Sequence, residues 1–310
     1  MIRTDFTATP VGRLSRRSAI SRLAGAGAAA VTATSLGLFR NDARGASTRA
    51  QSSAVTTQKG IAMTDSTPTT ARESAPLTVV LVHGAFADAS SWAGVIPILQ
   101  AAGVAVLAPA NPLRGINHDA TYIASVASQV PGPVLLVGHS YGGAVITNAG
   151  NRADNVRGLV YVAAFLPDDG ETLQALAAQA TDSQVGPALR PTSYPTSTSS
   201  PGAEFTIDPA SFHEVFCADL PAEQAAIMAV SQRPLAELAF GEATQDPAWK
   251  TLATWAIISP NDIVIGPAGE RAMAERAGAT ITEIDASHAM MISQPQAIAD
   301  VILAAVDAVR

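Results

Sequence analysis

The sequence predicts an α/β domain in which helices cover both faces of a mostly parallel sheet. From Leu77 onward, short apolar runs alternate with stretches of helical periodicity, which is the pattern of strand–helix–strand units. Several of these runs are continuously apolar, as expected for strands that are buried on both faces. Hydrophobic residues make up 48% of the 310-residue chain and charged residues 15%, which suits a large buried core.

The first half of this domain is predicted to hold four strands with helices between them. The β-branched run that starts at Leu77 ends at His83-Gly84, and a helical pattern starting at Asp88 is closed by Gly103. Pro109 and Pro131 end the next strand and the next helix in the same way. The predicted strands are Leu77–Val82, Val104–Ala108, Val134–Val137 and Val156–Ala164, and the helices are Asp88–Ala102 and Asp119–Val130.

The strand–helix pattern weakens after Leu166 and returns near the C-terminus. Residues 167–250 contain loops rich in proline and serine with short helical pieces, which indicates a cap inserted into the α/β domain. The helical pieces are predicted at Pro221–Ser231 and Pro234–Phe240, the returning strands at Trp255–Ile258 and Thr280–Ile284, and a closing amphipathic helix at Ala297–Val309.

The N-terminus has the composition of an export signal. Adjacent Arg16 and Arg17 precede the uncharged stretch Ala24–Phe39, which is short for a membrane span and resembles the apolar region of a twin-arginine-like signal peptide. We expect residues 1–46 to be this signal and residues 47–75 to be a flexible linker rich in Ser, Thr, Ala and Gln. The protein would then be periplasmic or extracellular. If translation starts at Met63 instead, it would be cytoplasmic.

Charge and cysteine content exclude several kinds of function. Residues 50–310 hold 11 basic and 24 acidic side chains, and this negative surface would repel nucleic acid. The single cysteine, Cys217, excludes an internal disulfide and a thiolate metal cluster. The sequence has no P-loop, no dinucleotide fingerprint and no H-E-x-x-H zinc motif, so we expect neither a cofactor nor a metal.

The strongest chemical signal is Gly138-His139-Ser140-Tyr141-Gly142-Gly143, directly after the strand Val134–Val137. It fits G-x-S-x-G between a strand and a helix, a tight turn that holds a serine in a strained conformation. The glycines are needed because backbone segments approach closely there. Ser140 is therefore the predicted nucleophile.

A serine nucleophile needs a base, and the base needs an acid that fixes its tautomer. Among the five histidines, His288 follows a predicted strand and so reaches the same sheet edge as Ser140. Asp262 follows the preceding strand, which gives the chain order serine, aspartate, histidine. Asp285 is a rival acid, although its closeness to His288 in sequence argues against it, and Asp246 is a weaker candidate.

The negative oxygen of a tetrahedral intermediate needs N–H donors. One candidate is the backbone of Tyr141, which follows the nucleophile, and the second is Ala85 in the loop after the first strand, with Phe86 as an alternative. Phe86 and the cap residue His213 are also candidate substrate contacts. A packed or solvated side chain is the competing interpretation of His213.

These motifs together resemble the α/β-hydrolase superfamily over residues 77–310. His83-Gly84-Ala85, Trp92, the serine turn and Ser287-His288-Ala289-Met290-Met291 are similar to the branch of plant methyl-ester esterases and hydroxynitrile lyases. The resemblance implies an α/β-hydrolase fold and an ester-cleaving triad without a cofactor. The lyases carry lysine where this chain has Ala289, and epoxide hydrolases and haloalkane dehalogenases carry aspartate in place of Ser140.

The sequence therefore predicts a serine esterase that acts on a small or medium apolar ester. The apolar cap side chains favour such a substrate: Phe205, Phe212, Phe216, Met228 and Leu235. The same triad could serve a carbon–carbon bond hydrolase or a perhydrolase. A receptor that keeps the pocket but barely turns over is a further alternative.

Overall fold

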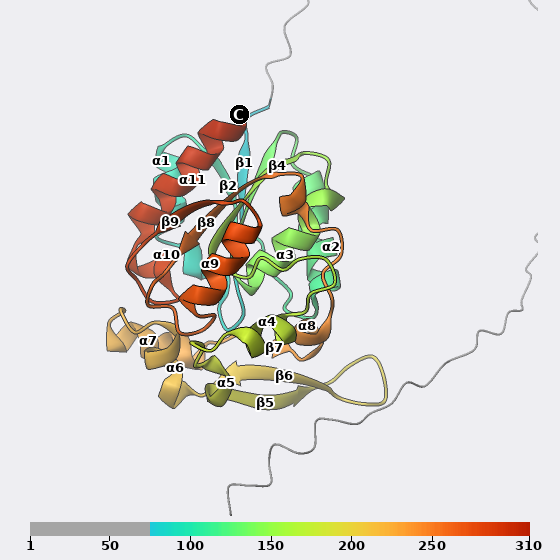
Figure 1. Ribbon diagram of the computed structural model, residues 1–310, viewed down its shortest axis with the longest axis vertical. Helices are drawn as coiled ribbons and strands as arrows, with labels where there is room; N and C mark the ends of the chain where they lie inside the picture. Colours follow the sequence, from blue (N-terminus) through green and yellow to red (C-terminus); the bar gives the residue numbers. More distant parts are fainter. Residues whose placement is uncertain (1–74) are drawn as a thin grey trace, which may run out of the picture. The chain divides into compact units, whose positions relative to one another are not determined.

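A computed structural model describes residues 75–310, and their centre is a six-stranded sheet in the order β2-β1-β3-β4-β8-β9 (Figure 1). Every strand pair in this sheet is parallel. The α/β class and the mostly parallel sheet predicted from the sequence are thereby confirmed. The strands are β1 Thr78–Val82, β2 Ala105–Leu107, β3 Val134–Ser140, β4 Val156–Ala164, β8 Ala253–Ile258 and β9 Thr280–Glu283.

Helices cover both faces of the sheet. On one face, α1 (Val95–Ala101) packs against α11 (Pro295–Val309), which also contacts β3, β4 and β8 (Figure 1). The other face carries α2 (Ile116–Ser128), α3 (Tyr141–Ala149) and α9 (Pro267–Arg276).

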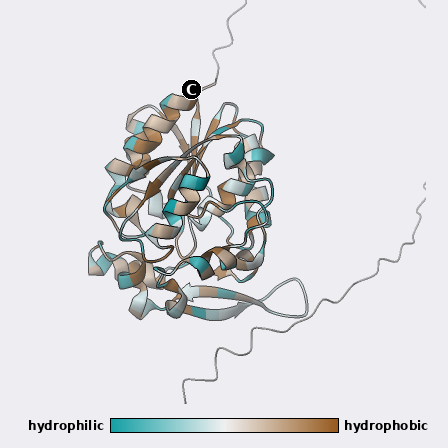
Figure 2. Ribbon diagram, viewed as in Figure 1, coloured by the Kyte–Doolittle hydropathy of each residue, from teal (hydrophilic) through white to brown (hydrophobic). Residues whose placement is uncertain are grey.

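Strand β1 explains why the central strands are continuously apolar. Val79 and Leu81 belong to the core on the α1–α11 side, whereas Val80 and Val82 belong to the core on the α2–α3 side. Successive side chains of a strand point to opposite faces, so a strand covered on both faces must be apolar at every position. Figure 2 shows hydrophobic strands at the centre and helices around them that carry both hydrophilic and hydrophobic residues.

The segment between β4 and β8 forms a cap over the end of the sheet where the strands finish (Figure 1). It contains short helices and a small antiparallel sheet in the order β5-β6-β7. Its elements are α4 Leu173–Gln179, α5 Val185–Ala188, β5 Leu189–Tyr194, β6 Gly202–Ile207, α6 Pro209–Phe216, α7 Ala222–Val230, β7 Leu235–Ala236 and α8 Leu238–Gly241.

Two predicted helices are interrupted. The helix expected over Asp88–Ala102 is a 3-10 turn at Ala89–Trp92 followed by α1, because the Asp88 carboxylate caps the Ser90 N–H and closes a separate short turn. The piece expected over Pro234–Phe240 begins as strand β7, where Leu235 pairs with Phe205 of the cap hairpin, and only then becomes α8. The edge of β6 supplies hydrogen bonds to Leu235–Ala236, and these stabilise a strand where the local sequence favours a helix.

The signal peptide and the linker predicted for residues 1–46 and 47–75 lie outside the described residues, apart from Ala75. Within residues 75–310, the helices all fall short of the length and apolar character that crossing a bilayer requires.

Candidate active site

Ser140 lies at the sharp turn between β3 and α3. Its backbone has φ 54° and ψ −122°, a conformation that non-glycine residues rarely adopt. A Cβ on Gly138 would lie 2.5 Å from the carbonyl oxygen of Gly142, and a Cβ on Gly142 would lie 2.5 Å from that of Val82. The two glycines are thus required by close backbone approach, as the sequence predicted, and they allow the turn to project Ser140 at the edge of the sheet.

His288 and Asp262 come together at this same edge. His288 follows β9 and Asp262 follows β8, and His288 Nδ1 lies 2.6 Å from Asp262 Oδ2 with both side chains fully buried. The other carboxylate oxygen, Oδ1, accepts the backbone N–H groups of Val264 at 2.6 Å and Ile265 at 3.2 Å. The rival Asp285 instead accepts a hydrogen bond from the exposed Asn261 side chain.

Asp262 is held in its ionised form. Burial would raise the pKa of this carboxyl group, but the charge and the hydrogen bond of His288 and the Val264 N–H lower it far below its ordinary value. The ionised Asp262 accepts the hydrogen of His288 Nδ1, which leaves Nε2 as the second nitrogen of the ring. Nε2 is buried and has no hydrogen-bond partner among residues 75–310.

Aromatic rings surround His288. The ring of His139, the neighbour of Ser140, lies with its centroid 4.7 Å from the His288 ring, and the ring of Phe216 from the cap lies at 5.0 Å. His139 Nε2 donates to the His288 carbonyl at 3.0 Å, which ties the serine turn to the histidine loop. Ser140 Oγ and His288 Nε2 form no hydrogen bond in the described residues; in ligand-free enzymes this contact often tightens only with substrate.

The hydrogen bonds of the backbone N–H groups distinguish Ala85 from Phe86 as the second oxyanion donor. Phe86 N–H donates to the Arg233 carbonyl of the cap at 3.1 Å. Within residues 75–310, the N–H groups of Ala85 and Tyr141 have no such partner. The structure therefore leaves Ala85 and Tyr141 available as donors, and Phe86 is already engaged.

His83 stabilises the loop that carries Ala85. Its Nδ1 donates to the Gly84 carbonyl at 2.9 Å, and its Nε2 accepts the backbone N–H of Asn111 at 2.9 Å. Burial lowers the pKa of His83 to about 4, so the ring is neutral and can make both bonds at once.

An apolar cavity of about 60 Å³ adjoins Ser140. The serine side contributes Ala85, Phe86 and Tyr141, and the loop after β8 contributes Val264 and Ile265. The cap completes the wall with Leu173, Ala177, Ser183, Val185, Leu189, Leu235 and Phe240. Of the apolar cap residues that favoured an apolar substrate in the sequence, this wall contains Leu235.

His213 does not line this cavity. It lies in α6, where its Nε2 donates to the Leu220 carbonyl at 2.9 Å. In this structure the imidazole ties the end of α6 to the following loop, and a role of His213 in contacting the substrate stays a prediction.

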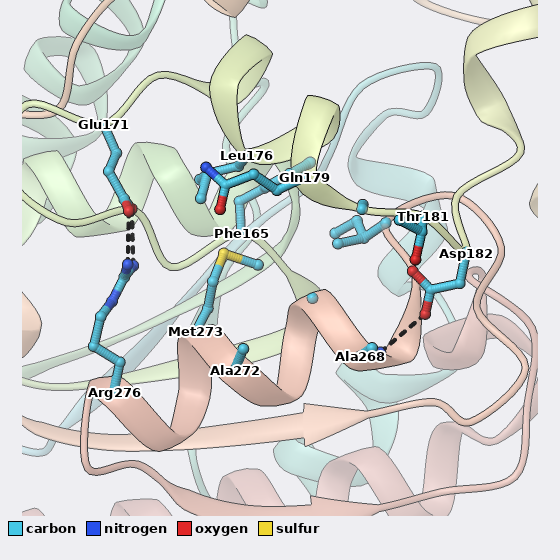
Figure 3. Close-up of a pocket in the computed structure, with 13 residues that line it drawn as sticks. Phe165, Glu171, Leu176, Gln179, Thr181, Asp182, Ala268, Ala272, Met273 and Arg276 are labelled. Atoms are coloured by element: carbon cyan, nitrogen blue, oxygen red, sulfur yellow. Dashed lines mark hydrogen bonds and ion pairs between the residues drawn. The ribbon is translucent and has the colours of Figure 1, made fainter.

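A second, wider groove of about 400 Å³ runs between α4 and α9 (Figure 3). Phe165 and Ile265 line both this groove and the cavity beside Ser140. At one end of the groove, Arg276 makes hydrogen bonds of 2.7 and 2.8 Å to the Glu171 carboxylate. At the other end, Asp182 accepts the Ala268 N–H at 3.1 Å. The small cavity thus has a larger space beside it.

Sequence reasoning missed the roles of three residues that lie against the histidine loop or Asp262. The Phe216 carbonyl accepts the N–H of Ala289 at 3.1 Å, and the Asp219 carboxylate accepts that of Ser287 at 3.0 Å. Glu270 of α9 lies against Asp262 and is 1% exposed. None of the three belongs to a motif, and all depend on long-range packing. No signal in the sequence marked Glu270, because the helix α9 that carries it was not itself predicted.

A parallel sheet with a strained serine turn at its centre, and with a histidine–aspartate pair at the same edge, defines the hydrolase class of α/β folds. The chain belongs to the alpha/beta hydrolase family, whose family model matches residues 79–301. This range includes Ser140, Asp262 and His288, and it confirms the resemblance inferred from the motifs.

Curated relatives match a shorter stretch. The chain is 36% identical over 119 residues to a carbendazim hydrolyzing esterase of Nocardioides sp. (strain SG-4G), a match that covers 34% of this chain and 49% of the relative. It is 34% identical over 103 residues to methylesterase 8 of Arabidopsis thaliana, covering 29% of this chain and 38% of the relative. The matches thus span at most about half the length of these relatives.

Solved structures share the whole fold. A polyneuridine aldehyde esterase has a TM-score of 0.63 at 22% identity, covering 74% of this chain and 98% of that one. The pyrethroid hydrolase PytH has a TM-score of 0.61 at 23% identity, covering 75% and 98%. Both likenesses confirm the predicted α/β-hydrolase fold.

Proposed function

We propose that this protein is a serine hydrolase that cleaves a small or medium apolar carboxylic ester through an acyl-enzyme intermediate. The observation that carries the proposal is the His288–Asp262 pair, whose free Nε2 lies buried at the sheet edge where the turn projects Ser140. Related proteins named as esterases, among them the carbendazim hydrolyzing esterase and methylesterase 8, add support.

The proposed reaction has two halves. Ser140 Oγ attacks the ester carbonyl while His288 Nε2 takes the hydroxyl proton, and the carbonyl oxygen becomes negative between the N–H groups of Ala85 and Tyr141. The intermediate then collapses, the bond to the alcohol breaks, and His288 returns the proton to the leaving alkoxide oxygen. In the second half, a water molecule gives a proton to His288 and attacks the acyl carbon, which releases the carboxylic acid and restores the Ser140 hydroxyl.

A fluorophosphonate probe tests this proposal directly. Such a probe phosphonylates an activated serine, so we expect one label per chain, located by mass spectrometry on the peptide that contains Ser140. His288→Ala should abolish labelling because no base remains to take the proton. Labelling of another residue, or none at all in a folded sample, would contradict the assignment of Ser140.

The dimensions of the cavity predict selectivity for short acyl or alcohol groups. Its volume of about 60 Å³ corresponds to roughly two water molecules, so longer groups must extend past Ala177, an exposed residue of α4 that also lines the cavity. Ala177→Leu is therefore expected to lower kcat/KM for p-nitrophenyl octanoate relative to the acetate by about tenfold. Ala178→Leu on the same helix is the matched control, because Ala178 is exposed and does not line the cavity. Equal ratios in the two variants would refute this path.

A further inference from the structure

Glu270 is a buried carboxyl group that the proposed reaction does not use. It lies in the first turn of α9 and is 1% exposed. Both of its carboxyl oxygens are buried and lack a well-formed hydrogen bond within residues 75–310, and only a weak influence of the Ser259 backbone favours the carboxylate. A carboxylate would be strongly destabilised in such a place, because the weak influence of the Ser259 backbone does not replace the water that it loses.

The group that Glu270 does contact is another carboxyl group, that of Asp262. Two carboxylates cannot both be ionised in contact away from water. Asp262 is the one that has partners for its charge, since it receives His288 and the N–H groups of Val264 and Ile265. Without an N–H or O–H donor between the two groups, a proton on Glu270 is what turns their contact into a hydrogen bond.

The other groups around Glu270 favour the same proton. Burial, and then the charge of Asp262 and the hydrogen bond to it, raise the pKa of Glu270 well above its ordinary value. The carboxylate of Asp182, from the cap, adds to this effect, and the backbone of Ser259 opposes it more weakly. The groups that face Glu270 thus come from two segments: Asp262 and Ser259 follow β8, and Asp182 belongs to the cap.

We propose that Glu270 is a positioning residue that stays protonated at neutral pH and donates its hydrogen bond to Asp262. The pair then holds one negative charge, and the Glu270 hydroxyl occupies an acceptor position of Asp262 that is not used by His288 or the loop amides. The role of this negative charge in catalysis rests on the proposed function, whereas the proton shared between Glu270 and Asp262 does not depend on it. Ionisation of Glu270 would place a second charge beside Asp262 and loosen its hold on His288.

Difference infrared spectroscopy of Glu270→Gln against the unaltered protein tests for the proton itself. A protonated carboxyl group has its own carbonyl stretch, distinct from that of a carboxylate. We expect this band at neutral pH in the unaltered protein and in Glu275→Gln, an exposed control on the same helix, and its loss in Glu270→Gln. Absence of the band from the unaltered protein, or its survival in Glu270→Gln, would overturn the proposal whether or not the protein is an esterase.

Stability against pH gives a second readout. The folded-state pKa of Glu270 is raised, so its protonated form stabilises the fold fully below the unfolded-state pKa, and this contribution is lost as pH rises toward the folded-state pKa. In that window the folding equilibrium constant of the unaltered protein should fall up to tenfold per pH unit relative to Glu270→Gln. Urea unfolding at several pH values measures it. A ratio that does not change with pH would contradict a protonated Glu270.

Kinetics separate a positioning role from a merely structural one. The amide of Glu270→Gln can still donate to Asp262, so kcat at neutral pH should stay close to that of the unaltered protein. Glu270→Leu removes the donor and should lower kcat about tenfold with KM unchanged. If Glu270→Leu does not fold, the glutamine variant alone decides: a tenfold loss of kcat in folded Glu270→Gln would overturn the positioning role.

Discussion

Replacing Ser140 by alanine is expected to lower kcat for p-nitrophenyl acetate hydrolysis by on the order of 10⁶-fold. The variant keeps the strained turn and the His288–Asp262 pair but has no oxygen to attack the carbonyl carbon, so the acyl-enzyme cannot form. Residual turnover would come only from the N–H donors of Ala85 and Tyr141 and from binding of the ester. Initial rates at saturating ester, with protein of verified fold, measure the effect.

Ser183 provides the matched control for this variant. Ser183 also lines the cavity, but its hydroxyl donates to the Val264 carbonyl at 2.6 Å and is not hydrogen-bonded to a histidine of the described residues. Ser183→Ala should therefore keep turnover of the same order as the unaltered protein. If Ser140→Ala hydrolysed the ester as fast as the unaltered protein, the proposed mechanism would be wrong.

Replacing Asp262 by asparagine is expected to lower kcat by about 10⁴-fold. The carboxylate accepts the hydrogen of His288 Nδ1 at 2.6 Å and so leaves Nε2 free to act as a base. An asparagine amide can donate to Nδ1 instead, which stabilises the tautomer that carries its hydrogen on Nε2 and cannot take a proton from Ser140. The loss should appear in kcat rather than KM, since Asp262 does not line the cavity.

Asp285→Asn is the control for this variant, because Asp285 was the rival acid and is exposed, contacting Asn261. It should leave kcat unchanged within a few fold. The stability of the two variants should also differ with pH. The folded-state pKa of Asp262 lies below its unfolded value, so its ionised form stabilises the fold at neutral pH and this contribution is lost on acidification. A kcat for Asp262→Asn equal to that of Asp285→Asn would exclude Asp262 as the acid.

The strands and the serine turn were predictable because local chemistry dictates them. A strand that is buried on both faces must be apolar throughout, and β4 was predicted with its observed bounds, Val156–Ala164. The glycines at 138 and 142 are required wherever the backbone packs so closely, so they mark the turn in the sequence itself. Helix α9 was missed, because its mostly polar sequence lacks the apolar stripe by which an amphipathic helix is recognised.

The residues that support the site belong to the tertiary structure. His213 was a reasonable substrate contact from the sequence, but the packing of α6 turns it toward the Leu220 carbonyl. The choice between Ala85 and Phe86 depended on a carbonyl of the cap, that of Arg233, which takes the Phe86 N–H.

By itself, the sequence determined the α/β fold, the strained turn at Ser140 and the order in which Asp262 and His288 follow their strands. Each of these depends on residues that are close together in the chain. Only the tertiary structure decided which side chains enclose the cavity, which N–H groups remain free and where the Glu270 carboxyl group lies. Those features arise where the cap and α9 meet the sheet, and contacts between segments so distant in the chain leave no periodic pattern in the sequence.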